Sequence, residues 1–324
     1  MARQPAPRVA HRGRGGTATG EASVVAIFGP TGVGKTAVAL ALADVVRRAG
    51  REPVAVSADA LQVYAGLELL TGAPSASEQA QLEHRLVGTV EASAPFSVGE
   101  YMPLAHAEID AALAAGRRPI VVGGTGLYLR AALSELDLGQ PPPPGMRERL
   151  EADVARRGVP ALHAELASLS PQAAERIQPT DRSRVVRALE LAAQGVERGV
   201  AESELWSAET RHPTLLAGLT MRRERLYERI DARVDEMIAT GAAESVRRVE
   251  TRGASQTARS ALGYAELLAG DADGMKRRTR RYAKRQLTWM RKMAGVQAID
   301  VTGRSAAATA RVIADRAGWS GADR

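Results

Sequence analysis

One short segment of the sequence has the residue types and spacing to bind phosphate. Residues 29–36 read GPTGVGKT, which matches the pattern GxxxxGK[ST] without a gap. The glycines let backbone N–H groups turn inward around a phosphate, and the helix that follows adds the positive end of its dipole. Lys35 supplies a positive charge, and the Thr36 hydroxyl is a ligand for Mg²⁺. We expect a di- or triphosphate to be bound by Gly29, Pro30, Thr31, Gly32, Val33, Gly34, Lys35 and Thr36.

Two further strand ends carry residues that could do chemistry. An ordinary nucleotide hydrolase has an acid near Mg²⁺ at the end of a second strand. The apolar run 118–122 ends instead in GGTG, residues 123–126, whereas the run 53–58 ends at Asp59, with Gln62 close behind. Because ligands of parallel sheets bind at the carboxyl ends of the strands, Asp59 and Gln62 could contact a nucleobase edge. Asp59 could equally cap a turn or order water around Mg²⁺.

The elements that position these residues form an alternating pattern. Residues 24–29, 53–58 and 118–122 are short apolar runs typical of buried parallel strands. An Ala/Leu/Val-rich helix follows the phosphate-binding loop and ends at Gly50, and a second helical stretch covers 101–115. Such repeats predict an α/β fold, with a P-loop NTPase-like parallel sheet flanked by helices.

The domain organisation changes at the run PPPP, residues 141–144. From there to about residue 210 the sequence is helical in pattern, highly charged and without a clear strand. We therefore expect residues 141–211 to form an inserted helical subdomain that binds RNA. Residues 23–140 and 212–317 would form the catalytic core, and residues 1–22 a disordered basic arm.

Two helices are predicted after the insertion. Residues 222–241 end at a glycine and place four apolar side chains on one face, namely Leu226, Ile230, Val234 and Met237. A basic helix is expected at 275–293, with Tyr282, Trp289 and Met293 packed on the core.

The positive charge of the chain is local. The net charge is +7, yet residues 275–299 contain nine Lys or Arg and no acid, so the remaining core and insertion are net acidic. Nine unbalanced cations would repel one another without an anion nearby, which favours contact with a nucleic-acid backbone. A solvated basic face is the alternative. The side chains expected to face the phosphates are Arg277, Arg281, Lys284 and Arg285.

Composition excludes several classes of protein. The chain has no cysteine, which excludes disulfides, Cys-ligated zinc and thiolate nucleophiles. It has only five scattered histidines, so we do not expect a metal that is held by protein side chains alone. No apolar run approaches the roughly 20 residues of a membrane span, and the N-terminus lacks the apolar stretch of a secretory signal. We expect a cytoplasmic, monomeric protein without membrane contact.

The order of motifs then resembles a known family. GPTGVGKT, SADALQVY, FSVGEYM, PIVVGGTGLYL, DRSRVVRALE, ALGYAEL and TRRYAKRQLTW follow one another as in the bacterial tRNA dimethylallyltransferases, over about residues 24–300. The resemblance implies transfer of a dimethylallyl group from dimethylallyl diphosphate to the N6 amine of adenosine 37, beside the anticodon. It also implies Mg²⁺ as cofactor and the tRNA anticodon stem-loop as partner.

The resemblance also implies roles for individual residues. Asp59 would be the general base, Thr125 a tRNA contact in the channel and Arg223 an arginine near the diphosphate. Further tRNA contacts are implied at Asp59, Ala60, Leu61, Gln62, Arg147, Ser183, Arg184, Val185, Val186, Arg187, Ser260, Ala261, Leu262, Gly263, Tyr264 and Ala265. The chain departs from the family at Leu61, where DSRQ becomes DALQ, and at Ala73, where a lysine is absent.

The implied chemistry suits these residue types. The adenine N6 amine is a poor nucleophile, so an aspartate must accept its proton as the N–C bond forms. Lys35, Mg²⁺ on Thr36 and Arg223 would stabilise the departing diphosphate, and the adenine must leave its stack to reach a buried site. Alternatives are a P-loop kinase of a small metabolite or nucleoside, prenyl transfer to a free adenine nucleotide, and a nucleic-acid-binding switch protein.

Overall fold

The computed structural model describes residues 21–196 and 205–320. The predicted disordered arm lies outside the described residues except for its last two. Of these, Ala22 is buried and its N–H donates to the Ala317 carbonyl over 2.9 Å, so the chain joins the core earlier than we expected.

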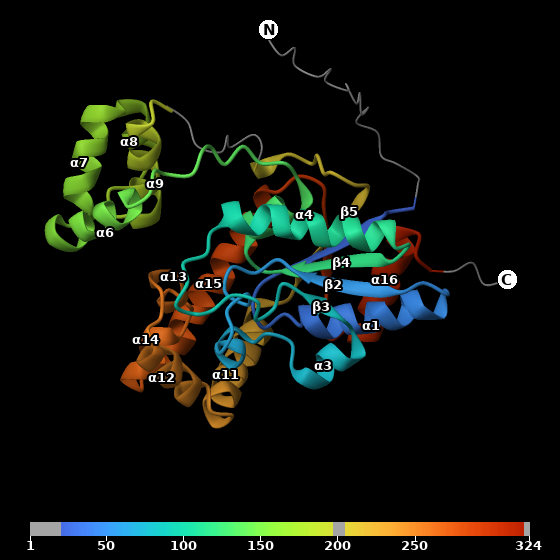
Figure 1. Cartoon of the computed structure of the whole chain (residues 1–324). Coiled ribbons are helices and arrows are strands. Elements are labelled where there is room, and N and C mark those ends of the chain that lie inside the picture. The colour runs from blue at the N-terminus through green and yellow to red at the C-terminus, as the bar shows by residue number, and fades with distance from the viewer. Residues whose placement is uncertain (1–20, 197–204, 321–324) are drawn as a thin grey trace, which may run out of the picture.

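A six-stranded sheet, parallel throughout, forms the centre of the molecule (Figure 1). The strand order is β3-β2-β4-β1-β5-β6. The strands are β1 (Val24–Phe28), β2 (Pro53–Ser57), β3 (His84–Arg85), β4 (Arg118–Gly123), β5 (Thr214–Thr220) and β6 (Val296–Asp300). The predicted α/β class and the strands β1, β2 and β4 are confirmed. The sequence did not indicate β3, β5 or β6.

Helices cover both faces of this sheet because its strands are apolar on both sides. In β1, Val25 and Ile27 face one apolar cluster, shared with α1 (Lys35–Arg48) and α16 (Ala306–Ala317). Val24 and Phe28 face the other cluster, shared with α4 (Val98–Ala114) and α5 (Gly126–Leu133). Figure 1 shows α4 above the sheet and α1 below it.

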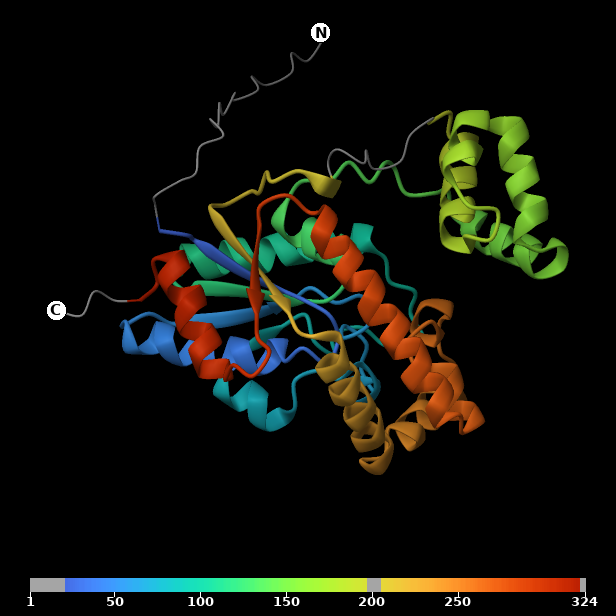
Figure 2. The ribbon, with the colours of Figure 1, turned by 180° about the vertical axis from the view of Figure 1, so that it is seen from behind.

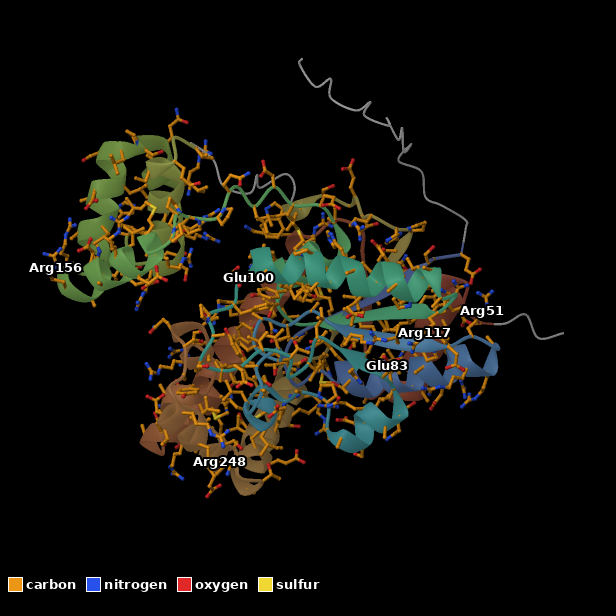
Figure 3. All side chains as sticks on the ribbon, in the orientation of Figure 1. Arg51, Glu83, Glu100, Arg117, Arg156 and Arg248 are labelled. Atoms are coloured by element: carbon orange, nitrogen blue, oxygen red, sulfur yellow. The ribbon has the colours of Figure 1, made fainter. Side chains whose placement is uncertain are left out.

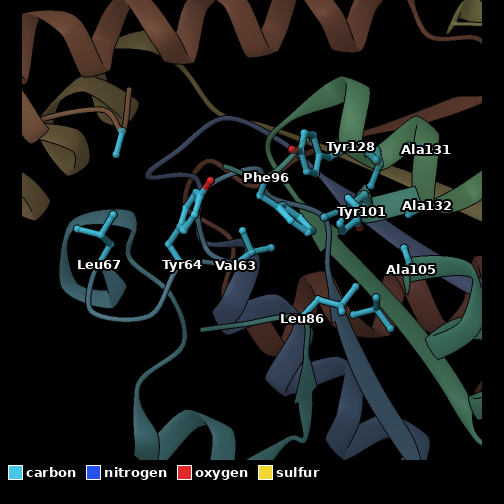
Figure 4. Packing of buried hydrophobic residues seen from close by; sticks show 14 of the residues in the cluster. Val63, Tyr64, Leu67, Leu86, Phe96, Tyr101, Ala105, Tyr128, Ala131 and Ala132 are labelled. Carbon is cyan, nitrogen blue, oxygen red and sulfur yellow. The ribbon is translucent and has the colours of Figure 1, made fainter. Parts of the chain in front are cut away.

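The second cluster extends into the loops that follow β2. Tyr64, Phe96, Tyr101 and Tyr128 lie together there (Figure 4), and the rings of Tyr101 and Tyr128 are 4.7 Å apart. The Tyr101 hydroxyl donates to the Ser57 carbonyl over 2.9 Å, which fixes the end of β2. This packing orders the segment that carries Asp59 and Gln62.

Two long helices lie at the carboxyl ends of the strands. Helix α11 (Arg223–Ala239) buries Leu226, Ile230 and Val234, as the spacing predicts. Helix α15 (Ala272–Lys292) is the predicted basic helix and packs beside α11 (Figure 2). Short helices complete this end, namely α2 (Glu68–Thr71), α3 (Ala76–Gln81), α12 (Ala242–Arg252), α13 (Gln256–Arg259) and α14 (Tyr264–Ala269).

The opposite end of the sheet carries ion pairs and no catalytic candidate. There Arg117 and Glu83 pair over 2.7 Å, far from the α11–α15 end (Figure 3). All of the predicted chemistry therefore lies at the carboxyl ends of the strands.

The insertion is a helical lobe set apart from the sheet (Figure 1). Its helices are α6 (Met146–Arg157), α7 (Val159–Leu169), α8 (Pro171–Arg176) and α9 (Arg182–Ala193). They enclose a small apolar core of their own, made of Val154, Leu162, Leu166, Ala174, Val185, Val186 and Leu189.

Across the described ranges, 21–196 and 205–320, we find no helix long and apolar enough to span a membrane.

Candidate active site

A cavity of about 1120 Å³ opens at the carboxyl ends of the strands. Its wall combines the phosphate-binding loop, the loop after β2, the turn after β4, and helices α11 and α15. The cavity thus collects segments that are far apart in the sequence, including Lys35, Thr36, Asp59 and Thr125.

The phosphate-binding loop has the backbone shape that its glycines predict. Gly32 and Gly34 have φ values of 81° and 101°, in the left-handed region that favours glycine. The Lys35 ammonium donates to the carbonyls of Gly29 and Pro30 over 3.0 and 3.1 Å. Thr36 lies in the first turn of α1 and faces the cavity. The loop therefore directs a lysine, a hydroxyl and a helix N-terminus at one space.

The surroundings of Lys35 shift its pKa. Burial, and after it the charge of Arg233, lowers the pKa of Lys35 to about 8, while the Asp59 carboxylate opposes this shift. An anion bound in the loop would favour the charged ammonium and raise that pKa again.

Asp59 lies just beyond β2, at the edge of the cavity. Its Oδ1 accepts the Leu61 N–H over 3.0 Å, so the carboxylate does cap a turn, as the alternative interpretation held. Its charge opposes the lowering of the Lys35 pKa and, after burial, contributes to the raised pKa of Tyr282, so Asp59 is near both the phosphate-binding loop and α15. One carboxylate oxygen orders the loop while the group remains part of the cavity wall.

Gln62 has a structural role that the sequence did not indicate. Its Nε2 donates to the Gly72 carbonyl over 3.2 Å, and its Oε1 accepts from the Ser57 hydroxyl over 2.9 Å. Both ends of the amide are used within the protein. Ala60 and Leu61 line the cavity beside it.

The glycines after β4 serve close packing. A Cβ on Gly123 would lie 2.1 Å from the Ala58 carbonyl oxygen, and one on Gly126 would lie 2.3 Å from the Trp289 ring. Both distances are too short for any side chain, so close approach of neighbouring groups requires glycine at both positions. Thr125 lines the cavity, with its hydroxyl 3.4 Å from that of Tyr282.

Arg223 does not line this cavity, and its place near the diphosphate stays a prediction. It is the first residue of α11, its side chain is 76% exposed and it pairs with Glu224 at 3.8 Å. Arg229 and Arg233, one helical turn apart and further along α11, line the cavity instead. Arg229 donates to the Gly32 carbonyl over 2.9 Å, and Arg233 to the Gly72 carbonyl over 3.2 Å. The sequence signal was two arginines at i and i+4 that flank the buried Ile230.

The basic helix is partly neutralised, which corrects our premise of nine unbalanced cations. Lys276 and Arg278 pair with Asp235 and Glu266 at 2.6 and 2.9 Å. Arg280 pairs with Asp231 and Arg277 with Asp271. Among the residues that the structure describes, five of the nine cations have no carboxylate partner and are exposed, namely Arg281, Lys284, Arg285, Arg291 and Lys292. Arg285 lines the cavity with its guanidinium over the Tyr282 ring.

The expected contacts in the lobe divide into exposed and structural residues. Arg147 binds Glu190 through two hydrogen bonds of 2.7 Å, and Arg187 binds the same carboxylate at 3.0 Å. Val185 and Val186 belong to the lobe's apolar core, so their side chains face no ligand. Ser183 and Arg184 are exposed at the start of α9.

The stretch from Ser260 to Ala265 divides in the same way. Ser260 and Leu262 line the cavity. Ala261, Gly263 and Tyr264 are buried, and the Tyr264 hydroxyl donates to Glu250 over 2.7 Å. Ala265 is exposed. The buried residues of this segment therefore pack behind the cavity wall and do not line the cavity.

The oxygen donors in the cavity fit Mg²⁺ that arrives with a phosphate. No group of three or more His, Cys, Asp or Glu able to hold a metal occurs in the described part of the chain. The Thr36 hydroxyl and the Asp59 carboxylate line one cavity with Lys35. Mg²⁺ commonly uses one or two such oxygens together with substrate phosphates and water.

Comparisons with known proteins agree with this geometry. Residues 62–293 match the family model described as IPP transferase, and residues 22–87 match that described as Isopentenyl transferase. The tRNA dimethylallyltransferase of Anaeromyxobacter sp. (strain Fw109-5) is 43% identical, covering 85% of this chain and 93% of its own length. That of Thermobifida fusca (strain YX) is 40% identical, over 83% and 87%.

Solved structures have the same fold. The full-length tRNA isopentenylpyrophosphate transferase from Bacillus halodurans aligns with a TM-score of 0.64 at 34% identity, covering 91% of this chain and 96% of that one. A eukaryotic dimethylallyltransferase acting on tRNA aligns with a TM-score of 0.69 at 24% identity, covering 90% and 77%, and supports the fold alone. From the family match and these relatives, the chain belongs to the IPP transferase family.

Proposed function

We propose that this protein transfers a dimethylallyl group from dimethylallyl diphosphate to the N6 amine of adenosine 37 of tRNA, and releases diphosphate. The observation that carries the proposal is that the phosphate-binding loop and Asp59 share one cavity of about 1120 Å³. That volume has room for a diphosphate, a five-carbon chain and an extruded base.

The donor's diphosphate is assigned to the phosphate-binding loop. Lys35 lies at its centre, and Arg229 and Arg233 approach from α11. These cations would stabilise the negative charge that gathers on the diphosphate as the allylic C–O bond breaks. Mg²⁺, bound through Thr36 and the phosphates, would neutralise part of the same charge.

The acceptor adenine is assigned to the side of the cavity near Asp59 and Thr125. As the bond between N6 and the allylic carbon forms, N6 loses one proton, which the Asp59 carboxylate accepts. The diphosphate leaves with the electron pair of the broken C–O bond. Aspartate suits this step because a carboxylate oxygen can accept a proton and the side chain is held by the turn it caps.

The tRNA is assigned to the exposed cations of α15 and to the lobe. Arg281 and Lys284 are free to contact phosphates, and Arg285 stands at the cavity rim. Such contacts contribute affinity and leave the choice of base to the cavity. A P-loop kinase would have no use for this surface, and β4 ends in glycines where many such enzymes carry an acid.

One experiment separates these functions. The protein is incubated with unmodified tRNA, Mg²⁺ and dimethylallyl diphosphate, and the tRNA is digested for nucleoside mass analysis. We expect adenosine heavier by one dimethylallyl group at position 37, and no such product when a chelator removes Mg²⁺. Replacement of the tRNA by AMP tests transfer to a free nucleotide. ATP with small acceptors tests the kinase, and phosphorylation without prenylation would contradict the proposal.

We also propose that the protein works as a monomer, since one chain supplies every segment of the cavity wall. Light scattering across concentrations at which the enzyme is active would detect a dimer.

A further inference from the structure

Gln286 joins three segments of the active site through one side chain. It lies on the inner face of α15 and is 4% exposed. Its Oε1 accepts the N–H of Thr31 in the phosphate-binding loop over 2.8 Å. Its Nε2 donates to the Gly124 carbonyl, in the turn after β4, also over 2.8 Å. A buried amide with both ends bonded holds its neighbours at fixed separations.

The chemistry of the amide determines which residue can stand here. The Thr31 N–H requires an acceptor and the Gly124 carbonyl requires a donor, and glutamine provides one of each. The space is also closed, because a Cβ on Gly124 would lie 2.3 Å from the Gln286 Nε2. Glycine at 124 and glutamine at 286 therefore fit each other.

The helical turns of α15 on either side of Gln286 also contact the segment 123–126 after β4, which we call the glycine turn. Tyr282, one helical turn before Gln286, places its hydroxyl 3.4 Å from that of Thr125. Trp289, nearly one turn after it, covers Gly126. The turn that carries Thr125 is thus seated along α15, and Gln286 alone on this face also reaches the phosphate-binding loop, within the described residues.

We infer that Gln286 is a positioning residue that sets the separation between the phosphate-binding loop and the Thr125 turn. The inference rests on the proposed function, in which the loop holds the donor and the turn borders the acceptor base. Both substrates would still bind without this bridge, but the allylic carbon and N6 would meet in poorer alignment. Misplacement of reacting groups by about 1 Å can cost about 100-fold in rate.

The test compares Gln286→Met, which keeps the length of the side chain but cannot bridge, with wild type. Single-turnover rates are measured with tRNA and dimethylallyl diphosphate both saturating. The Kd values for tRNA and for inorganic diphosphate with Mg²⁺ are measured separately. We expect the rate to fall at least about tenfold, while both Kd values stay within about threefold of wild type.

Two further variants keep the test decisive. Gly124→Ala pushes on the same amide from the other side and should slow the reaction similarly, even if Gln286→Met fails to fold. Its effect and that of Gln286→Met should not add in the double variant, because both break one bridge. Thr288→Ala is the matched control, since the Thr288 hydroxyl bonds only within α15, to the Lys284 carbonyl, and should react at the wild-type rate.

The outcomes separate this inference from the proposed function. A wild type that produces no prenylated adenosine refutes both. An active wild type together with folded Gln286→Met and Gly124→Ala variants that react at its rate refutes the inference alone. So does a variant whose Kd for diphosphate weakens by clearly more than the limit of about threefold allowed above, because Gln286 would then shape the phosphate-binding loop itself.

Discussion

At the scale of single residues, the site brings two half-buried cations and one carboxylate together before any substrate is present. Burial lowers the pKa of both Lys35 and Arg233, the charge of Arg233 lowers that of Lys35 further, and Asp59 partly offsets both shifts. A bound diphosphate would relieve this repulsion. The free protein therefore holds unsatisfied positive charge where the leaving group's negative charge will form.

The shifted pKa of Lys35 predicts a pH dependence of binding. In the free protein this pKa is lowered to about 8, and bound diphosphate must raise it. Affinity for diphosphate should therefore be constant below about pH 8 and fall above it, by up to about tenfold per pH unit. Titration calorimetry with inorganic diphosphate and Mg²⁺ between pH 7 and 9.5 measures this. Lys35→Met should bind weakly and show no such fall, and an equally steep fall in that variant would assign the effect to another group.

A second residue-scale prediction concerns Asp59. Asp59→Asn should lower turnover by about 10²–10⁴-fold, the usual contribution of general-base catalysis, while tRNA and diphosphate still bind. The amide can accept the Leu61 N–H as Asp59 does, so the turn should survive. Single-turnover assays at saturation report the chemical step, and the melting temperature serves as control. Near wild-type turnover would remove Asp59 from the mechanism.

The sequence predicted these residues to different degrees. Lys35, Thr36 and Asp59 follow directly from a contiguous motif and a strand end, so local sequence was sufficient. Arg229 and Gln286 reach the cavity only because α11 and α15 pack across the carboxyl ends of the strands. Since no local pattern encodes that packing, sequence placed the phosphate-side arginine at Arg223, on the exposed first turn of α11.

At the scale of elements, α15 has two faces with different tasks. Its inner face, through Gln286 and Trp289, seats the glycine turn, and its flanks are held by ion pairs to α11 and α14. Charge neutralised within the fold is not available to RNA. The cations without a carboxylate partner are exposed, and Arg281 and Lys284 are two of them.

This division predicts which cations bind tRNA. The double variant Arg281→Gln/Lys284→Gln should weaken the binding of all tRNA substrates about equally. The slope of log affinity against log salt concentration should become shallower by about one unit for each phosphate that the variant no longer neutralises. Affinity for diphosphate should hardly change. Arg280→Gln is the contrasting variant, because it breaks the pair with Asp231. It should lower the melting temperature, while its affinity for tRNA should fall less than that of the double variant. An unchanged affinity and slope in the folded double variant would make this face merely solvated.

The strands that sequence missed have physical reasons. The run of β5, TLLAGLT, is interrupted by a glycine. A Cβ on Gly218 would lie 2.5 Å from Val296, so this glycine marks a close approach rather than a turn. The β6 sequence VQAID lies at the sheet edge, half exposed, and lacks a continuous apolar run. β3 pairs through only two residues. The two edge strands, β3 and β6, lack a continuous apolar run and depend on the neighbour they pair with. The inner strand β5 was missed because its glycine reads as a turn signal.

At the scale of the whole molecule, the lobe is a separate packing unit. Its apolar core shares no residue with the two clusters of the sheet domain. At its centre Glu190, with a side chain 0% exposed, is clamped by Arg147 and Arg187. Removal of one partner from a buried pair leaves an uncompensated charge.

Glu190→Ala should destabilise the lobe by about 1–3 kcal/mol, because Arg147 and Arg187 lose their shared partner while their side chains stay 48% and 28% exposed. The sheet domain and its affinity for diphosphate should not change. Hydrogen exchange followed by mass spectrometry would show faster exchange in α6 and α9 alone. Arg184→Ala, at an exposed position of α9, should leave exchange unchanged. Faster exchange throughout the sheet would show that the two units fold together.

Both chain segments that join the lobe to the core are anchored on the core side. The Arg211 N–H donates to the Leu133 carbonyl over 2.8 Å, and the Ser134 hydroxyl to the Glu209 carbonyl over 2.7 Å. Trp206 packs against Trp289 of α15 with the two rings tilted by 59° and their centroids 4.7 Å apart. These interactions hold the two connections close together where they meet the core.

Removal of the lobe is therefore expected to leave a folded core. A variant with residues 141–204 replaced by a Gly/Ser linker of about ten residues, a length that a flexible chain spans easily, should keep the wild-type Kd for inorganic diphosphate. Its affinity for tRNA should fall at least about tenfold, because the cations proposed to bind phosphates from the lobe are gone. Calorimetry with diphosphate and filter binding with tRNA measure the two affinities.

Lys35→Ala, with an intact lobe, should show the reverse pattern, binding tRNA but not diphosphate. If the shortened protein binds tRNA as well as wild type, the lobe has another role and α15 with the cavity rim is the whole of the tRNA site.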